Sequence, residues 1–271
     1  GIRYQPRSRG LGDVYKRQAY NQRSLFVTGV WTTVQLALAG TAIAFVLALL
    51  MVFLRIQEPD KRNNDFVKII KIVANKFARF YIFVIRGTPM MVQSLIFYYA
   101  IFNLFKRTGM SVTEINRVWS LFISGLVTVS LNSTAYLAEV LRGGILAVDA
   151  GQMEAARSLG MTHWQAMRRV VFPQAIKNSL PAIGNEFIIN IKDSSVLCVL
   201  GVSDLMFMTR SVAGIYYKGT ECYLIAATVY LFLTYLSSLL LKAITGRMTA
   251  PDNTKRRQGN QTVDLGLPSS N

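Results

Sequence analysis

The sequence is poor in the residues that build catalytic and metal sites. It has one histidine, His163, and two cysteines, Cys198 and Cys222, among 271 residues. One histidine with two distant cysteines does not complete a zinc site, and the two cysteines show neither C-x-x-C spacing nor any sign of a disulfide. We therefore expect no metal site and no catalytic residue, and we expect both cysteines to be small packing residues.

The sequence also lacks a phosphate-binding loop. It contains no run of the form G-x-x-x-x-G-K followed by Ser or Thr, which is the run that cradles nucleotide phosphates in many ATP-binding proteins. The chain is therefore not expected to bind ATP or its magnesium ion in the usual way. We expect a protein that is not an enzyme and that carries no cofactor of its own.

Charged residues are scarce as well. Only 16% of the residues are charged and the mean hydropathy is +0.32, whereas soluble domains carry about 25% charged residues. The net charge of +16 is compatible with nucleic-acid binding. However, the cations lie mostly beside apolar runs, which fits contact with lipid headgroups better. We expect a membrane protein that contacts lipid and no nucleic acid.

Five apolar runs are long enough to be candidate membrane spans, since about 20 apolar residues cross a bilayer. Backbone that faces lipid must satisfy its own hydrogen bonds, so each run is expected to be helical. The sequence therefore predicts an all-α membrane protein with five transmembrane helices, at Gly29–Leu54, Thr88–Phe105, Val118–Leu146, Leu180–Met208 and Cys222–Leu241.

The distribution of cations predicts the orientation of these spans. Most of the 30 Lys and Arg residues lie in three stretches, Arg55–Arg86, Arg142–Lys192 and the segment from Lys242 onward. Few lie around Lys106–Arg117 and Arg210–Lys218. The positive-inside rule places the three basic stretches in the cytoplasm, with the N-terminus outside and the C-terminus inside.

The two ends of the sequence differ from the rest. Six cations precede Ser24 and contradict this orientation. Residues 1–18 have no apolar core of a signal peptide, so we expect a non-native or disordered leader and exclude it from the fold. A real basic N-terminal arm is the alternative. Residues 25–247 then form the transmembrane domain. Residues 248–271 are polar and rich in turn formers, and we expect them to be a disordered cytoplasmic tail.

A polar, helix-prone stretch lies between two of the apolar runs, within residues 149–181. Asp149 with Gln152, and Thr162 with Gln165, have the spacing of a helix N-cap and its reciprocal partner. Gly160 lies between them and suits the left-handed conformation that ends a helix. This pattern predicts a cytoplasmic helix–turn–helix. It also suits a simple amphipathic connector, and that alternative remains open.

The same stretch resembles a known motif. Glu154-Ala155-Ala156, three residues, Gly160, nine residues and then the apolar run that ends at Pro173 are similar to the EAA loop of ABC importer permeases. Val170 and Phe172 replace the usual Ile and Leu and keep the apolar character. The resemblance implies that this is a coupling loop, which fits a groove on a separate ATP-binding subunit that holds ATP and magnesium. Pro173 is expected to stop or kink the second helix.

Further matches resemble the polar amino acid uptake family of these permeases. They are Arg86-Gly87-Thr88-Pro89 with Gln93, the run from Asn132 to Glu139, Arg142-Gly143-Gly144, and Lys192-Asp193-Ser194-Ser195. The resemblance implies a permease in the bacterial inner membrane that pairs with itself or with a related permease. It also implies an extracytoplasmic binding protein that delivers a polar amino acid. An ATP-independent channel, or a permease for another small polar solute, is the alternative.

Polar residues inside the apolar runs are candidates for the translocation path. Charges at membrane depth are costly, so they face a cavity, a partner or each other. They either line the path of a zwitterion or hold the bundle together, and the sequence leaves both open. Glu139 and Arg142 are spaced for a local ion pair. The candidate path residues are Asn132, Glu139, Lys192, Asp193, Ser194 and Ser195.

Overall fold

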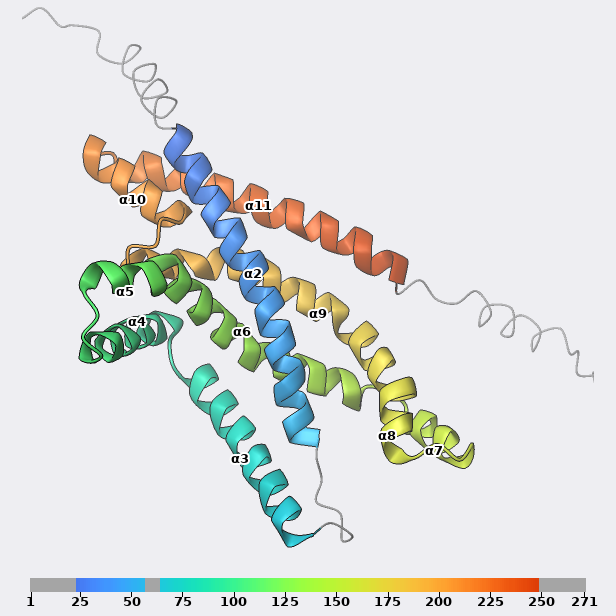
Figure 1. The fold of residues 1–271 in the computed structure, drawn as a ribbon. Helices are drawn as coiled ribbons and strands as arrows, with labels where there is room; N and C mark the ends of the chain where they lie inside the picture. Colours follow the sequence, from blue (N-terminus) through green and yellow to red (C-terminus); the bar gives the residue numbers. More distant parts are fainter. Residues whose placement is uncertain (1–22, 57–63, 249–271) are drawn as a thin grey trace, which may run out of the picture.

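The computed structural model describes residues 23–56 and 64–248, and in these ranges the regular structure is helical throughout. The expected leader, residues 1–18, and nearly all of the expected tail, residues 248–271, lie outside the described residues. The elements (Figure 1) are α2 (Arg23–Ile56), α3 (Asp65–Gly87), α4 (Met90–Arg107), α5 (Val112–Val118), α6 (Leu121–Leu146), α7 (Ala150–Ser158), α8 (His163–Ala166), a π-helical turn η1 (Met167–Val171), α9 (Phe172–Asp193), a 3-10 turn η2 (Ser194–Val199), α10 (Leu205–Tyr216) and α11 (Gly219–Met248).

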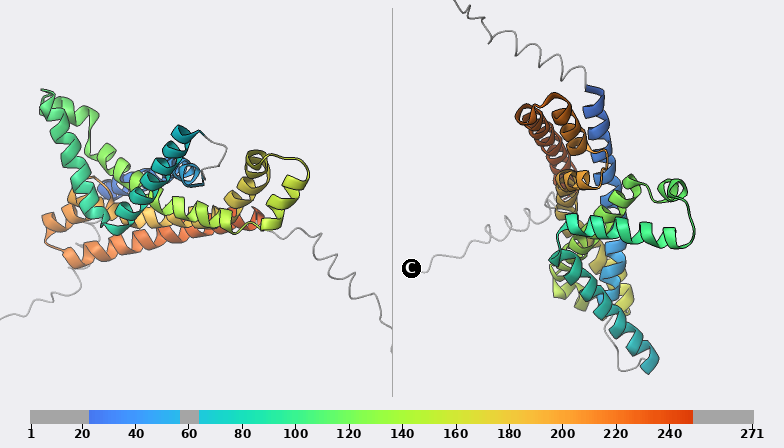
Figure 2. Two further views of the ribbon diagram at one scale, coloured as in Figure 1. Left: turned by 90° about the horizontal axis from the view of Figure 1, so that it is seen from below. Right: turned by 90° about the vertical axis from the view of Figure 1, so that its left-hand side faces the viewer.

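Helices α2 and α6 cross at the centre of the bundle, and α9 packs against both (Figures 1 and 2). Their contact is built from small side chains, among them Ala44 and Ala48 on α2 and Ala135 and Ala138 on α6, which are all fully buried. Small residues let helix backbones approach closely, and this is how helices associate where the solvent is lipid. Such packing is typical of a membrane bundle.

Three described helices are long and apolar enough to cross a membrane: Arg23–Ile56, Leu121–Leu146 and Gly219–Gly246. They confirm the helices expected at the first, third and fifth apolar runs. Helices α3 and α4 meet the same criterion only when taken together, and they are bent by 113° at the break between them. By length and composition, the described residues therefore contain three candidate spans, or four if the bent pair is one broken span.

The expected span Leu180–Met208 is not one helix, so its interpretation as a single helical run is wrong. Helix α9 ends at Asp193 and is followed by the 3-10 turn η2. Gly201 then adopts a φ of +92°, and Asp204 caps the new helix α10 by accepting a hydrogen bond from the Phe207 N–H at 2.9 Å. A left-handed glycine followed by an N-cap ends one helix and starts another.

The basic stretch Arg55–Arg86, which was expected to be cytoplasmic, contains most of the 23-residue helix α3. Apolar side chains recur along α3 every three or four residues, as on one face of a helix. That face points away from the bundle, so it is available to lipid or to another subunit. The exposed apolar residues include Phe66, Ile70, Val73, Phe77, Phe80 and Phe83.

The packing of α6 against α9 depends on Gly144. A Cβ atom added there would lie 2.0 Å from the Ser179 Oγ and 2.6 Å from the Ala175 carbonyl oxygen. We expect Gly144→Ala to destabilise the protein by about 1–3 kcal/mol through overpacking. The thermal unfolding midpoint of the protein purified in detergent measures this.

The neighbouring glycine provides a matched control for that substitution. A Cβ atom at Gly143 would meet nothing within 4 Å, and alanine is the better helix former. Gly143→Ala is therefore expected to leave the midpoint unchanged or slightly raised. Equal midpoints for the two variants would show that the close contact between α6 and α9 does not limit stability.

Candidate functional site

The polar stretch folds as the helix–turn–helix that its capping residues predict. The Thr162 Oγ1 accepts a hydrogen bond from the Gln165 N–H at 3.2 Å, and the Thr162 N–H donates to the Gln165 Oε1 at 2.9 Å, which confirms the second capping box. Asp149 is the N-cap of α7, as expected, but it accepts from the Gly151 N–H at 2.7 Å. The Gln152 Oε1 instead accepts from the Gln174 side chain at 3.4 Å.

The turn between α7 and α8 is built on Gly160, which has the predicted left-handed conformation, with a φ of +83°. The Gly160 N–H donates to the Arg157 carbonyl at 3.0 Å, and the Met161 N–H donates to the Ala156 carbonyl at 3.2 Å. These two bonds form a Schellman motif, which satisfies the last carbonyls of a helix and favours glycine at this position. A local sequence signal therefore fixed this turn.

The prediction that Pro173 stops the second helix is wrong, because the helical path continues beyond it. The kink stays a prediction. The chain continues through the π turn η1 into α9, and the Phe172 N–H donates to the Met167 carbonyl, five residues earlier. Proline lacks an N–H, and its ring clashes with the carbonyl four residues before it, here that of Arg169. Arg169 lies within the wider π turn, so the helical path continues past the proline.

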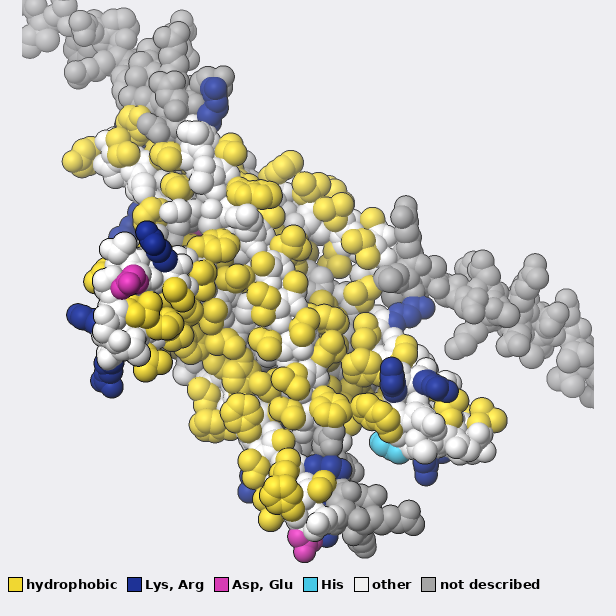
Figure 3. Space-filling model, in the orientation of Figure 1, with side chains coloured by type: hydrophobic (Ala, Val, Ile, Leu, Met, Phe, Trp, Pro, Cys, Tyr) yellow, Lys and Arg dark blue, Asp and Glu magenta, His cyan; other side chains and the backbone are white. Residues whose placement is uncertain are grey.

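The turn exposes apolar as well as polar side chains. Glu154 and Ala155 are exposed, Leu159 is 81% exposed and Trp164 is 56% exposed, while Ala156 is buried. Figure 3 shows the segment at the lower right, where the histidine lies among cationic side chains. In the described part of the chain, no three His, Cys, Asp or Glu side chains lie close enough together to hold a metal ion.

The loop also contacts the end of α2. The Trp164 ring packs edge-on against the Phe53 ring, with centroids 5.8 Å apart and an interplanar angle of 76°. Aromatic pairs prefer such edge-to-face geometry. The loop therefore has a direct contact with α2, in addition to its covalent connections to α6 and α9.

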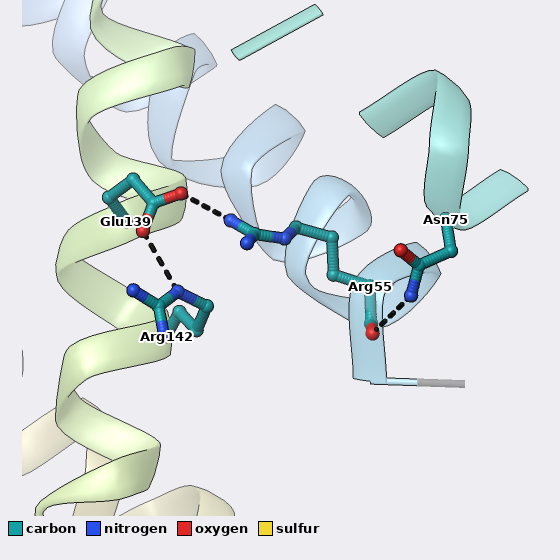
Figure 4. A network of polar contacts seen from close by, with 4 residues as sticks. All are labelled: Arg55, Asn75, Glu139 and Arg142. Carbon is teal, nitrogen blue, oxygen red and sulfur yellow. Dashed lines mark hydrogen bonds and ion pairs between the residues drawn. The ribbon is translucent and has the colours of Figure 1, made fainter. Parts of the chain in front are cut away.

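A network of charges joins the same end of α2 to α6 (Figure 4). The Glu139 carboxylate pairs with Arg142 one turn along α6, at 2.8 Å, as the spacing predicts, and with Arg55 of α2. The Asn75 side chain of α3 donates to the Arg55 carbonyl oxygen at 2.9 Å. The sequence indicated the Glu139–Arg142 pair but not Arg55, because nothing local connects residues 84 positions apart.

Asn132 belongs to a second polar cluster, which braces the break between α3 and α4. The Asn132 Nδ2 donates to the Gln93 Oε1 at 2.9 Å. The Gln93 Nε2 in turn donates to the Ile85 carbonyl at 2.7 Å and to the Thr88 carbonyl at 2.9 Å. Gln93 and Asn132 are both buried, so the brace is enclosed within the bundle. The two matched motifs that contain these residues thus meet in space.

A third cluster was not predicted from the sequence. The Asn190 side chain of α9 donates to the Thr41 Oγ1 of α2 at 2.8 Å and accepts from the Ser133 hydroxyl of α6 at 2.9 Å. All three side chains are buried. Satisfied polar groups in the interior fix the register of the helices that carry them. The only sequence signal was a set of isolated polar residues inside apolar runs.

The last four candidate path residues lie together at the end of α9. Lys192 is exposed, Asp193 and Ser195 are partly buried, and Ser194 is buried, with its hydroxyl donating to the Ile191 carbonyl at 3.0 Å. No recorded contact links them to Glu139 or Asn132 within the described residues. The six candidates therefore lie in separate polar clusters along the bundle.

A bundle of long apolar helices with internal polar clusters and an exposed helix–turn–helix at one end is the architecture of a membrane protein. Residues 70–250 match the family described as binding-protein-dependent transport system inner membrane component. The match covers more than half of the chain, and the chain belongs to this family.

Two relatives and one solved structure illustrate the similarity. The chain is 31% identical to the nopaline transport system permease protein NocM of Agrobacterium fabrum, over 79% of this chain and 84% of that protein. It is 34% identical to the glutamine transport system permease protein GlnP of Escherichia coli, over 65% of this chain and 76% of that protein. A crystal structure of an amino acid ABC transporter with histidines has a TM-score of 0.70 and 38% identity, and covers 84% of this chain and 96% of that one. The chain is a permease subunit of an ABC transport system.

Proposed function

We propose that the chain is the transmembrane subunit of an ATP-driven importer for polar amino acids. The similarity to permeases named for glutamine and nopaline, and to a transporter crystallised with histidines, supports this substrate class. The observation that carries the proposal for coupling is the exposed helix–turn–helix with its left-handed Gly160. ATP and magnesium bind to a partner subunit, and this chain supplies no catalytic residue.

The coupling loop docks on the ATP-binding subunit through the face that carries Glu154 and Ala155. Leu159 is a large apolar side chain that is almost fully exposed beside Gly160, and exposed apolar groups of this kind mark contact surfaces when they gather with other such groups. Trp164 is the second exposed group. Ala156 and Pro173 belong to the same motif. Ala156 packs inside the loop, and Pro173 shapes the start of α9.

In this proposal the chain crosses the membrane five times, with α2, α6 and α11 as single helices. The bent pair α3–α4 forms one crossing, and α9, η2 and α10 together form another. The N-terminus lies outside, and the C-terminus and the loop α7–α8 lie in the cytoplasm. The cation distribution and the positive-inside rule support this orientation.

The orientation predicts opposite labelling of two exposed positions, Gln165 and Thr113. In a background with Cys198 and Cys222 replaced by alanine, a cysteine at Gln165 is expected to resist an impermeant thiol reagent in intact cells and to react in inside-out vesicles. A cysteine at Thr113 is expected to do the reverse. Labelling at Gln165 from outside would contradict both the orientation and the coupling role of the loop.

One five-crossing unit supplies half of a translocation path, so the functional transporter contains a second permease subunit, either identical or related. The exposed apolar faces of α3 and α11 are available to that subunit and to lipid. An extracytoplasmic binding protein delivers the amino acid to the outer side. Lys192, Asp193, Ser194 and Ser195 stay candidates for the path, whereas the ion pairs of Glu139 favour a structural role for that residue.

The proposal is tested by uptake into vesicles that contain the permease and its ATPase, with the binding protein outside. Radiolabelled L-glutamine and L-histidine are expected to accumulate only with ATP in the compartment that the ATPase faces. Uptake that is equal without ATP would favour an ATP-independent channel. ATP-driven uptake of another solute, with neither amino acid transported, would keep the importer and reject the substrate class.

A further inference from the structure

Arg86 is a cation whose only recorded side-chain contact in the described residues is an aromatic ring. It lies in the last turn of α3, beside the break that leads into α4. Its guanidinium carbon lies 5.3 Å from the centre of the Tyr136 ring of α6. Both side chains are exposed. The ion pairs of the described residues do not include Arg86.

The position of Tyr136 places this cation within the membrane. Helix α6 has 26 residues, so it is about 39 Å long at 1.5 Å per residue, and Tyr136 lies roughly 22 Å from its start. A hydrocarbon layer about 30 Å thick covers that level in every position in which the layer lies between the two ends of the helix. Because the guanidinium lies over this ring, it lies at the same depth and not at the headgroups.

A charge at that depth is too costly to face lipid, so it faces a polar cavity or another molecule. The contact between the guanidinium and the ring is a cation–π contact and uses no hydrogen bond of the guanidinium. The N–H groups at its edge remain available, and their planar fork matches a carboxylate in a bidentate arrangement. The chemistry of the group that fits this position is therefore anionic, planar and small.

The backbone on both sides of Arg86 is held in place by the brace described above. The Gln93 Nε2 donates to the carbonyl oxygens of Ile85 and Thr88, which come directly before and after the Arg86-Gly87 pair. It also donates to the Thr88 hydroxyl at 2.8 Å. Asn132, one turn before Tyr136 on α6, fixes Gln93. The backbone around Arg86 and the helix that carries Tyr136 are thus both held by the buried Gln93–Asn132 pair. A group that is held in place in this way binds its partner at a lower entropic cost.

We propose that Arg86, in cation–π contact with Tyr136, binds the α-carboxylate of the amino acid as it passes through the membrane. This inference rests on the proposed function, since it assumes that the substrate carries a carboxylate. It adds a binding residue that the candidate path did not include. The Gln93–Asn132 pair acts through Arg86 as a positioning element and does not touch the substrate.

The test compares four variants in the vesicle assay with L-glutamine and L-histidine and with their α-amides, in which a neutral carboxamide replaces the carboxylate. Arg86→Gln is expected to lower the maximal uptake of both amino acids by roughly 10- to 100-fold, the range for a lost charge-assisted hydrogen bond. Arg86→Lys keeps the charge without the fork and is expected to recover part of the loss. Tyr136→Phe keeps the ring face and is expected to transport like the wild type.

The matched control is Arg79→Gln, which removes another exposed arginine two turns earlier on α3 and is expected to leave uptake unchanged. The amount of co-purified ATPase reports assembly. For each variant, the ratio of amino acid uptake to amide uptake measures how much transport depends on the carboxylate. The binding protein is the same in every sample, so its own preference contributes equally to every ratio. Arg86→Gln is expected to lower this ratio toward one.

Three results would overturn the inference. They are unchanged uptake in Arg86→Gln, an equal loss for amino acids and amides, and loss of the assembled complex, which would make Arg86 a contact between subunits. If the wild type takes up no amide, the test is the comparison of amino acid uptake in Arg86→Lys and Arg86→Gln. Uptake in Arg86→Lys that is no higher than in Arg86→Gln would then reject the inference. Failure of the wild type to take up either amino acid would instead reject the proposed substrate class and would leave the inference without its premise.

Discussion

Gly160→Asp and Glu154→Lys are expected to yield a protein that reaches the membrane but no longer drives ATP-dependent uptake. Gly160 has a φ of +83°, and a left-handed conformation costs an ordinary residue about 1–2 kcal/mol. A Cβ atom there meets nothing within 4 Å in this chain. The larger effect therefore falls on the partner that covers the turn, which the new side chain and the reversed charge would repel.

Two further substitutions separate backbone strain from lost docking. Asn tolerates the left-handed conformation better than most residues, so Gly160→Asn adds a side chain with little strain. Gly160→Ala adds the strain with the smallest side chain. If docking is the cause, Gly160→Asn loses more uptake than Gly160→Ala, and if strain is the cause, the order reverses.

The measurements for these variants are uptake, ATP hydrolysis stimulated by loaded binding protein, and the amount of co-purified ATPase. Glu221→Lys reverses an exposed charge near the start of α11 and serves as the control for Glu154→Lys, with wild-type uptake expected. Wild-type uptake in both Gly160→Asp and Glu154→Lys would mean that the loop is only a connector, and the coupling proposal would lose its main support.

Glu139→Gln is expected to lower the stability of the protein markedly. The substitution leaves Arg55 and Arg142 without their carboxylate, and removal of one partner of a buried ion pair costs about 3–5 kcal/mol. The side chains are 22% exposed for Glu139, 16% for Arg55 and 41% for Arg142, so partial exposure reduces this cost. Since Arg55 is the more buried partner, Arg55→Gln is expected to be more harmful than Arg142→Gln.

The thermal unfolding midpoint and the yield of assembled complex measure this effect. The double variant Arg55→Met with Glu139→Met removes both charged side chains of this ion pair. Because no unpaired charge of the pair stays buried, the double variant is expected to recover much of the lost stability. Normal stability with abolished transport in Glu139→Gln would contradict the structural role. It would place Glu139 in the translocation path.

The sequence determined the features that depend on neighbours a few residues apart. The Thr162–Gln165 capping box and the left-handed Gly160 follow from hydrogen bonds within one turn, so their spacing was sufficient to predict them. The long apolar runs that became α2, α6 and α11 were equally clear, because their length exceeds what a soluble helix needs. The family motifs were read from the same local spacing.

Tertiary structure decided everything that joins distant parts of the chain. Arg55 and Glu139 are 84 residues apart, and Thr41 and Asn190 are 149 apart, so no local pattern connects them. The outward apolar face of α3 depended on how the helices pack. The sequence placed Arg86 at the end of a basic stretch that was expected in the cytoplasm. Only the crossing of the bent α3–α4 pair with α6 placed it on Tyr136 at membrane depth, because the level of a charge in a bundle is set by helix packing and not by its position in the sequence.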